Sequence, residues 1–152
     1  PATWRLLLDA GWTGDGALKA IVGGEAWGWD LAAPLLERCG SVWNAYGPTE
    51  ATVWVALRAV QPDEGRVSMG GPLQNTTLHV LDANGEPAPV GVPGELCIGG
   101  LNVALGYLGR PELTTERFVS DPFDAAGGWV GRLLAHDQWS WAFSVPPAAR
   151  AG

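Results

Sequence analysis

A run of seven residues at positions 44–50, Asn-Ala-Tyr-Gly-Pro-Thr-Glu, holds side chains that could bind a nucleotide. The Thr49 hydroxyl and the Glu50 carboxylate suit a phosphate oxygen and a hard cation such as Mg²⁺, which prefers oxygen ligands. The flat ring of Tyr46 suits the face of a nucleobase. Gly47-Pro48 breaks regular structure, because glycine tolerates unusual dihedrals while proline fixes φ and lacks an N–H. By composition alone an ordinary turn at a strand end is the commoner explanation, so the neighbouring elements matter.

The elements before this run follow the order helix, strand, helix, strand. Apolar spacing predicts a helix at residues 4–10, a strand at 18–22, a helix at 31–39 and a strand at 41–44. We expect Gly40 to end the second helix. Strand, helix and strand form a parallel crossover unit, and ligands of such sheets bind beyond the carboxyl ends of the strands. Gly23-Gly24-Glu25 and residues 46–50 both lie at such ends.

The pattern changes at about residue 61. Short strands are expected at residues 67–69, 77–81 and 95–98, and Asn84-Gly85 between apolar runs is a hairpin signal. Residues 111–118 predict a short helix with proline in its first turn. This half is therefore expected to be antiparallel and barrel-like.

These patterns predict an α/β chain with three parts. Residues 1–60 form the parallel α/β portion, residues 61–126 the antiparallel β portion, and residues 127–152 an atypical tail that remains unassigned. A chain of 152 residues is long enough for one domain with a sizeable core.

Composition narrows the classes of partner. The formal net charge of −7 argues against nucleic acid and against an anionic membrane surface. No apolar run approaches the roughly 20 residues of a membrane helix, and no signal-peptide pattern is visible. Cys39 and Cys97 lack metal-ligand spacing, so we expect them reduced and buried. A soluble, cytoplasmic protein is expected.

Residues 44–50 resemble the nucleotide-binding core motif of the amino-acid adenylation domains of nonribosomal peptide synthetases, a branch of the adenylate-forming enzymes. A second core motif of those domains is matched, in the expected order, by residues 94–100 (Gly-Glu-Leu-Cys-Ile-Gly-Gly), 106–108 (Gly-Tyr-Leu) and 110–118 (Arg-Pro-Glu-Leu-Thr-Thr-Glu-Arg-Phe). The similarity runs from about Trp4 to Phe123. It implies the large N-terminal subdomain of an adenylate-forming enzyme. Such domains are several times longer than this chain, so we expect an internal fragment.

The resemblance also implies a set of site residues. The nucleotide-binding set is Gly23, Gly24, Glu25, Asn44, Ala45, Tyr46, Gly47 and Thr49. Tyr46 would stack on adenine, Thr49 would contact phosphate and Glu50 would bind Mg²⁺, which makes Thr49 and Glu50 the catalytic residues. Asn44 either fixes the turn or faces the adenine edge, and the two uses are compatible. Without the resemblance, a core tyrosine, a helix-capping threonine and a solvated glutamate would explain the same residues.

The amino-acid pocket of similar domains is lined by positions that here carry Ile21, Gly23, Ala45, Val53 and Trp54. An indole projecting into the cavity would leave little room. The resemblance therefore favours a substrate with a small side chain, such as glycine or alanine.

Two places depart from the family pattern. Asn102 and Leu105 stand where glycine and arginine are expected. Asparagine is the non-glycine residue that best tolerates positive φ, so the first change could be mild, whereas the second removes a planar donor. After residues 121–123 the family reaches a Thr-Gly-Asp motif that this chain lacks, and Asp137 is either a displaced remnant or part of a divergent end.

The reaction implied by the resemblance is formation of an aminoacyl-adenylate from an amino acid and Mg·ATP, followed by transfer to a phosphopantetheine thiol. The expected partners are the carrier (thiolation) and condensation domains of a parent synthetase. The family's catalytic lysine and upstream phosphate loop have no counterpart here, so the chain alone is expected to be inactive. Two alternatives stay open: a non-catalytic remnant or interaction module, and an acyl-CoA ligase-type enzyme.

Overall fold

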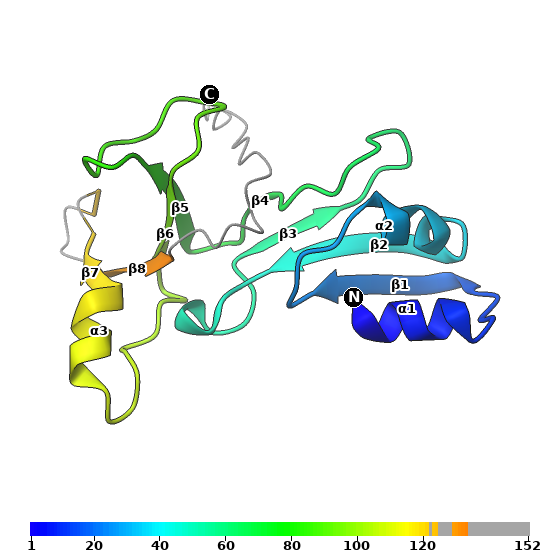
Figure 1. Ribbon diagram of the computed structural model, residues 1–152, viewed down its shortest axis with the longest axis horizontal. Helices are drawn as coiled ribbons and strands as arrows, with labels where there is room; N and C mark the ends of the chain where they lie inside the picture. The colour runs from blue at the N-terminus through cyan, green and yellow to red at the C-terminus, as the bar shows by residue number, and fades with distance from the viewer. Residues whose placement is uncertain (122, 125–128, 134–152) are drawn as a thin grey trace. The chain divides into compact units, whose positions relative to one another are not determined.

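The structure, a computed structural model, describes residues 1–121, 123–124 and 129–133, which divide between two compact units (Figure 1). The first unit contains residues 1–47 and 56–71. The second contains residues 48–55 and the chain from residue 72 onward. The boundary between the units therefore falls within the run at residues 44–50.

The first unit is built on a mixed sheet with the strand order β1-β2-β3-β4. Its elements are α1 (Ala2–Asp9), β1 (Asp15–Gly23), α2 (Trp29–Leu36), β2 (Cys39–Tyr46) and β3 (Ala56–Ala59), and the sheet ends at β4 (Gly71–Pro72). Strands β1 and β2 are parallel and joined by α2, whereas β3 runs antiparallel to β2. The predicted parallel crossover unit is confirmed.

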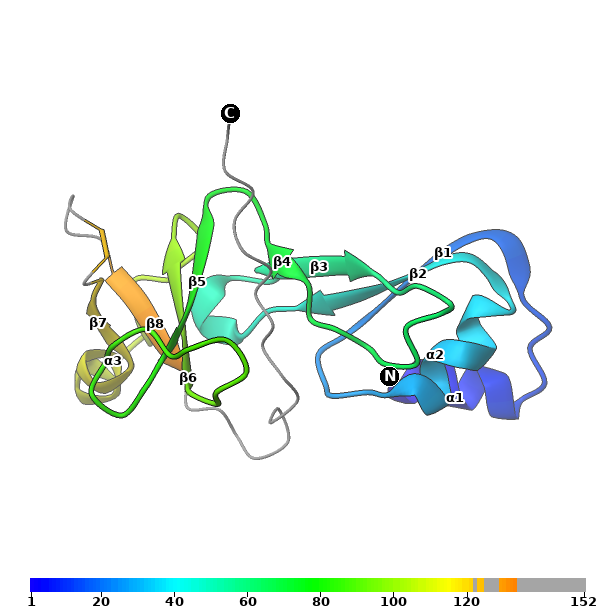
Figure 2. The ribbon, with the colours of Figure 1, turned by 90° about the horizontal axis from the view of Figure 1, so that it is seen from above.

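Both helices of the first unit cover the same face of its sheet (Figure 2). Side chains alternate along a strand, so Ala20 and Val22 of β1 are buried while Ile21 between them is 54% exposed. Leu31 and Leu35 of α2 belong to the same core. This packing leaves the face that carries Ile21 uncovered within the first unit.

The expected helix stop at Gly40 is wrong. Helix α2 ends at Leu36, and Gly40 lies inside β2. A Cβ at Gly40 would overlap the carbonyl oxygen of Gly16, where the register between β1 and β2 is irregular. Glycine is needed there because two backbones approach closely, which is its usual role inside a strand.

The stretch between β3 and β4 also differs from the prediction. The strand expected at residues 67–69 is wrong, because these residues lie in an irregular loop, and β3 is a strand that no pattern predicted. The loop backbone finds a partner outside the sheet, because the Ser68 carbonyl accepts a hydrogen bond from the Asn44 side chain. A side-chain partner of this kind replaces the ladder that a strand would need.

The second unit is built on an antiparallel sheet with the strand order β5-β6-β8-β7. Its elements are the short 3₁₀ helix η1 (Thr49–Ala51), β5 (Thr76–Leu81), β6 (Glu95–Gly100), α3 (Pro111–Arg117), β7 (Phe118–Ser120) and β8 (Trp129–Leu133). The predicted antiparallel character is confirmed. Within the described residues the sheet is open, with β5 and β7 at its edges, so the barrel-like expectation is corrected to an open sheet.

The turn predicted at Asn84-Gly85 follows β5. The Asp82 carboxylate accepts backbone N–H groups of Asn84 (2.8 Å) and Glu86 (3.0 Å), and these hydrogen bonds hold the pKa of Asp82 below its usual value. A short aspartate side chain that bonds its own backbone two residues on is a common turn device.

Both cysteines are buried and neither forms a disulfide, as predicted. Burial raises the pKa of the Cys39 thiol, and the charge of Asp15 adds to the increase. None of the helices that the structure describes has the length and apolar character that a bilayer-spanning segment needs. The tail beyond residue 133, including Asp137, lies outside the described residues.

Candidate functional site

Two different elements carry the run at residues 44–50. Asn44, Ala45 and Tyr46 are the last residues of β2 in the first unit. After Gly47-Pro48, Thr49 and Glu50 form the start of η1 in the second unit. The predicted adenine-binding and phosphate-binding residues therefore lie in consecutive elements that belong to different units.

Asn44 is a buried polar side chain, 8% exposed, whose amide is hydrogen-bonded at both ends. Its Oδ1 accepts the Trp27 indole N–H at 2.8 Å, and its Nδ2 donates to the Ser68 carbonyl at 2.9 Å. This pairing fixes the amide orientation, because a flipped amide would lose both bonds. Asn44 thus ties the loop after β1 and the loop after β3 to the end of β2. Contact with the adenine edge remains a prediction.

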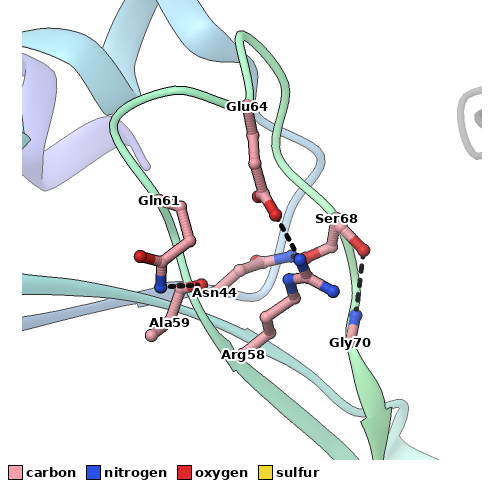
Figure 3. Close-up of polar contacts among 7 residues, drawn as sticks. All are labelled: Asn44, Arg58, Ala59, Gln61, Glu64, Ser68 and Gly70. Atoms are coloured by element: carbon pink, nitrogen blue, oxygen red, sulfur yellow. Dashed lines mark hydrogen bonds and ion pairs between the residues drawn. The ribbon is translucent and has the colours of Figure 1, made fainter.

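The loop that presents Ser68 is itself held in place (Figure 3). An ion pair joins Arg58 of β3 to Glu64, and the Gly70 N–H donates to the Ser68 hydroxyl at 3.3 Å. Gly70 has a φ of +88°, and a Cβ there would overlap the Arg58 side chain. The partners of Asn44 are therefore fixed by contacts of their own.

Three of the five predicted pocket residues share one face of the first sheet. Gly23 pairs with Ala45 across β1 and β2, and Ile21 is two residues before Gly23. These residues lie on the face opposite to α1 and α2. Trp43 pairs with Ile21 on the same face and was missed, although its position two residues before Ala45 could have identified it.

The other two predicted pocket residues, Val53 and Trp54, follow η1 in the second unit and are 56% and 37% exposed. Gly24 and Glu25 follow β1 directly. Gly24 has a φ of +85°, which favours glycine, and no atom lies within 4 Å of an added Cβ. The predicted loop after β1 is therefore open around Gly24, and its contact with a ligand remains a prediction.

Glu50 is held by a segment of the second core motif. The Tyr107 hydroxyl donates to Glu50 Oε1, and the Ala104 N–H donates to the Glu50 carbonyl at 2.8 Å. The Thr52 hydroxyl donates to the Asn102 carbonyl at 2.8 Å. Residues 102–107 therefore contact the segment around Glu50 three times, a relation that no sequence pattern indicated.

Tyr107 is placed by packing as well as by this bond. Its ring meets Phe118 edge to face, with centroids 5.5 Å apart and an interplanar angle of 74°. Burial raises the pKa of Tyr107 to about 12, and the hydrogen bond to Glu50 and the Glu50 charge add to the increase. Tyr107 is therefore a neutral hydrogen-bond donor to a carboxylate at neutral pH.

Asn102 does not adopt a positive φ; Thr52 and Asn75 are the non-glycine residues with positive φ in the described part of the chain. Asn102 instead donates its side-chain amide to the Thr76 hydroxyl at 2.6 Å. Thr52 has a φ of +71°, which is rare for a β-branched residue and marks local strain. The unusual backbone therefore lies two residues after Glu50.

The donor set fits Mg²⁺ in one of its common modes. Within the described residues no group of three or more histidine, cysteine, aspartate or glutamate side chains could hold a metal. Mg²⁺ is commonly bound through one or two protein carboxylates and completes its shell with water and nucleotide phosphate oxygens. A single carboxylate such as Glu50 is compatible with that mode and incompatible with an all-protein cage.

A cavity of about 580 Å³ in the second unit lies elsewhere. Its lining includes Asp82, Glu95 and Cys97, and none of the predicted site residues belongs to it. Cavity size and predicted chemistry thus point to different places.

Comparison with known proteins decides the family. The family model described as AMP-binding enzyme matches residues 1–108. The chain belongs to the AMP-binding enzyme family. The matched residues include the whole run at residues 44–50 and also Tyr107. Glu50 and the residue that hydrogen-bonds its side chain therefore both lie within the part of the chain that matches the family.

Relatives place this AMP-binding chain among peptide synthetases. It is 51% identical over 124 residues to the PKS-NRPS hybrid synthetase acdB of Aspergillus candidus, covering 81% of this chain and 5% of the relative. It is 40% identical over 152 residues to a dimodular nonribosomal peptide synthase of Bacillus subtilis, covering 99% of this chain and 6% of the relative. The adenylation-domain recognition is confirmed.

A solved structure matches the AMP-binding chain over most of its length. A four-domain nonribosomal peptide synthetase, holo-AB3403 bound to AMP and glycine, superposes with a TM-score of 0.82 at 45% identity. The match covers 88% of this chain and 10% of that one. The chain thus spans a tenth or less of each relative named here, and the fold is that of a synthetase adenylation domain.

Proposed function

We propose that the protein carrying this chain activates an amino acid as its adenylate for nonribosomal peptide synthesis. A carboxylate oxygen of the amino acid attacks the α-phosphorus of ATP, and the bond to pyrophosphate breaks. The observation that carries the proposal is the match over 88% of the chain to a synthetase bound to AMP and glycine. Such catalysis depends mainly on positioning the reactants and neutralising phosphate charge. Hydrogen-bonding and metal-binding side chains such as those of Thr49 and Glu50 are suited to these tasks.

The nucleotide contacts come from both elements of residues 44–50. Tyr46 at the end of β2 stacks on adenine, and Thr49 at the start of η1 donates to phosphate. Glu50 would hold a Mg²⁺ ion that accompanies the nucleotide, and such an ion would supply neutralisation of phosphate charge. Asn44 supports the end of β2 through its hydrogen bonds with Trp27 and Ser68, and its second amide N–H and second lone pair leave a contact with the adenine edge possible. Gly24 and Glu25 flank the nucleotide from the loop after β1.

The amino acid has a small side chain. Ile21, Gly23 and Ala45 share one sheet face and offer apolar contacts without a charged group. Trp54 also stands at a pocket position of similar domains, and a bulky indole at that position favours a substrate with a small side chain. The relative crystallised with glycine is consistent with this preference, which we extend to glycine and alanine.

The product passes to a carrier domain. The phosphopantetheine thiol of the carrier attacks the acyl carbon of the adenylate, a thioester forms and AMP leaves. Carrier and condensation domains of the same synthetase are the proposed partners, in line with the four-domain architecture of the matched structure.

Amino-acid-dependent ATP–pyrophosphate exchange tests the proposal. We expect the full-length protein to exchange label with glycine or alanine, and we expect the 152-residue chain alone to show no amino-acid-dependent signal. Exchange that depends on a fatty or aryl acid instead of an amino acid would assign the protein to a different adenylate-forming branch. Clear exchange by the chain alone would overturn the expectation that it is incomplete.

A further inference from the structure

We propose that Tyr107 is the positioning residue of the Glu50 carboxylate: its hydroxyl holds Oε1 and leaves Oε2 to a hard divalent cation. The proposal rests on the function proposed for Glu50 above. It adds a role for the second core motif, because Tyr107 lies 57 residues after Glu50 in the sequence. Tyr107 itself touches neither metal nor nucleotide in this proposal.

Contacts on both sides of the carboxylate support the role. The Ala104 N–H fixes the Glu50 carbonyl at 2.8 Å, and the Thr52–Asn102 hydrogen bond fixes the backbone two residues later. With the backbone held twice by residues 102–104, the Tyr107 hydroxyl determines the direction of the carboxylate. Ligating carboxylates commonly depend on such outer hydrogen bonds for their orientation.

A neutral donor is the appropriate partner for a metal-binding carboxylate. A lysine or arginine on Oε1 would cancel the charge that attracts the cation, whereas a phenol leaves the carboxylate negative. Besides Glu50, the charged side chains that act on Tyr107 are Arg117 and Glu116, and they pair with each other at 3.3 Å. Tyr107 therefore orients Glu50 without neutralising it.

Tyr107 has the rigidity that a positioning residue requires. Its backbone N–H donates to the Thr114 hydroxyl at 2.9 Å, and the same hydroxyl donates to the Arg110 carbonyl. The ring rests against Phe118. A Tyr107→Phe substitution keeps the ring and this backbone bond, and it removes only the hydroxyl that reaches Glu50.

The strained backbone at Thr52 agrees with a segment held for function. A β-branched residue at a φ of +71° is disfavoured, and it persists only where surrounding contacts determine it. The Thr52–Asn102 bond is such a contact. The loop that carries Tyr107 thus also maintains the conformation that follows Glu50.

Mn²⁺ binding in the presence of ATP, measured by electron paramagnetic resonance on the full-length protein, tests the proposal. We expect Tyr107→Phe to weaken Mn²⁺ binding by about tenfold, the lower end of the range for partners of metal-binding carboxylates. Glu50→Gln should weaken it further. Thr115→Ala is the matched control, because it removes a hydroxyl that bonds the Pro111 carbonyl on the exposed face of α3. It should leave Mn²⁺ binding unchanged.

A second readout separates positioning from loss of structure. In the exchange assay, Tyr107→Phe should raise the Mg²⁺ concentration for half-maximal rate about tenfold, and excess Mg²⁺ should restore the rate. A folding defect would lower the rate at every Mg²⁺ concentration. Should Tyr107→Phe fail to fold, Thr52→Val, which removes one bond to the same loop, should show the same Mg²⁺ dependence to a smaller extent.

The outcomes distinguish the two proposals. Weaker Mn²⁺ binding in Glu50→Gln with wild-type binding in Tyr107→Phe overturns the positioning role and leaves the function of Glu50 intact. Unchanged binding in Glu50→Gln removes the metal role of Glu50 and the present inference with it. In a Tyr107→Phe protein that unfolds at the same denaturant concentration as the wild type, a rate loss that excess Mg²⁺ does not restore also overturns the positioning role.

Discussion

The two ends of residues 44–50 use their polar side chains in opposite ways. Asn44 is buried, and both ends of its amide bind protein groups, Trp27 and Ser68. Glu50 accepts a hydrogen bond from the Tyr107 hydroxyl on one of its two carboxylate oxygens. The first end supports the fold of its unit, while the second presents a charge. One short motif therefore combines a buried amide that binds two protein groups with a carboxylate for which we propose a role in metal binding.

The residues that hydrogen-bond to Asn44 and to Glu50 also differ in how far away they lie along the chain. Asn44 is held by residues 17 and 24 positions away, within one α/β unit. Glu50 is held by Tyr107, 57 positions away in the second core motif. The hydrogen bond from Tyr107 to Glu50 therefore links the later motif to the end of the earlier one.

The strongest test of the comparison is Glu50→Gln. If the carboxylate is the functional end, the exchange rate of the full-length protein should fall about 100-fold, as for loss of other groups that stabilise charge in a transition state. Thr115→Ala should leave the rate unchanged. A fall of less than about threefold, well below that range, would show that Glu50 is as structural as Asn44.

Asn44→Ala tests the other end. This substitution leaves the Trp27 N–H and the Ser68 carbonyl without their hydrogen-bond partner. The free energy of unfolding should therefore fall by about 2–3 kcal/mol. Denaturant unfolding followed by tryptophan fluorescence measures it. Gln61→Ala is the control, because Gln61 makes an exposed 3.5 Å hydrogen bond whose loss should cost less than about 0.5 kcal/mol. Equal losses in both variants would remove the structural role of Asn44.

The Trp54→Ala substitution tests whether the second unit, which carries Glu50, also determines which amino acid is selected. Opening the pocket should raise exchange with leucine relative to alanine by about tenfold, the low end of what pocket size commonly achieves. Competition between the two amino acids in the exchange assay measures the ratio. An unchanged ratio would leave selectivity to Ile21, Gly23 and Ala45 in the first unit.

The smallest expected effect concerns pH. Because the pKa of Tyr107 is raised to about 12, above its usual value near 10, the folded state retains a proton that the unfolded state loses. This contribution to stability is fully present below pH 10 and is lost as pH rises towards 12. Unfolding at pH 9, 10 and 11 should show a decline that is reduced in Tyr107→Phe. An identical decline in both proteins would contradict the raised pKa of Tyr107.

Local patterns predict much of the fold. Apolar spacing identifies α1 and the strand–helix–strand unit, and the sequence between residues 77 and 98 identifies β5 and β6. These elements follow from periodicity, which is a local property. The four residues of β3, Ala-Leu-Arg-Ala, have too few apolar and β-branched side chains to be distinguished from a loop.

Gly40 and Asn102 are poorly described by their local sequence, because each contacts a residue far away in the chain. Gly40 has the sequence context of a helix stop, but it lies in a strand because Gly16 approaches it. Asn102 is expected to replace glycine at positive φ, but its amide bonds Thr76 instead. In both cases the residue is explained by a partner more than twenty positions away, which no local pattern contains.

The sequence by itself determined the family and the chemistry available, because residues 44–50 carry their aromatic ring, hydroxyl and carboxylate in a fixed order. It also determined the crossover unit, since apolar periodicity specifies which faces must be buried. Only the tertiary structure decided which polar side chains bind other protein groups and which can still bind a ligand. Asn44 is occupied because two loops fold back onto β2, and Glu50 is oriented because the segment carrying Tyr107 packs beside η1.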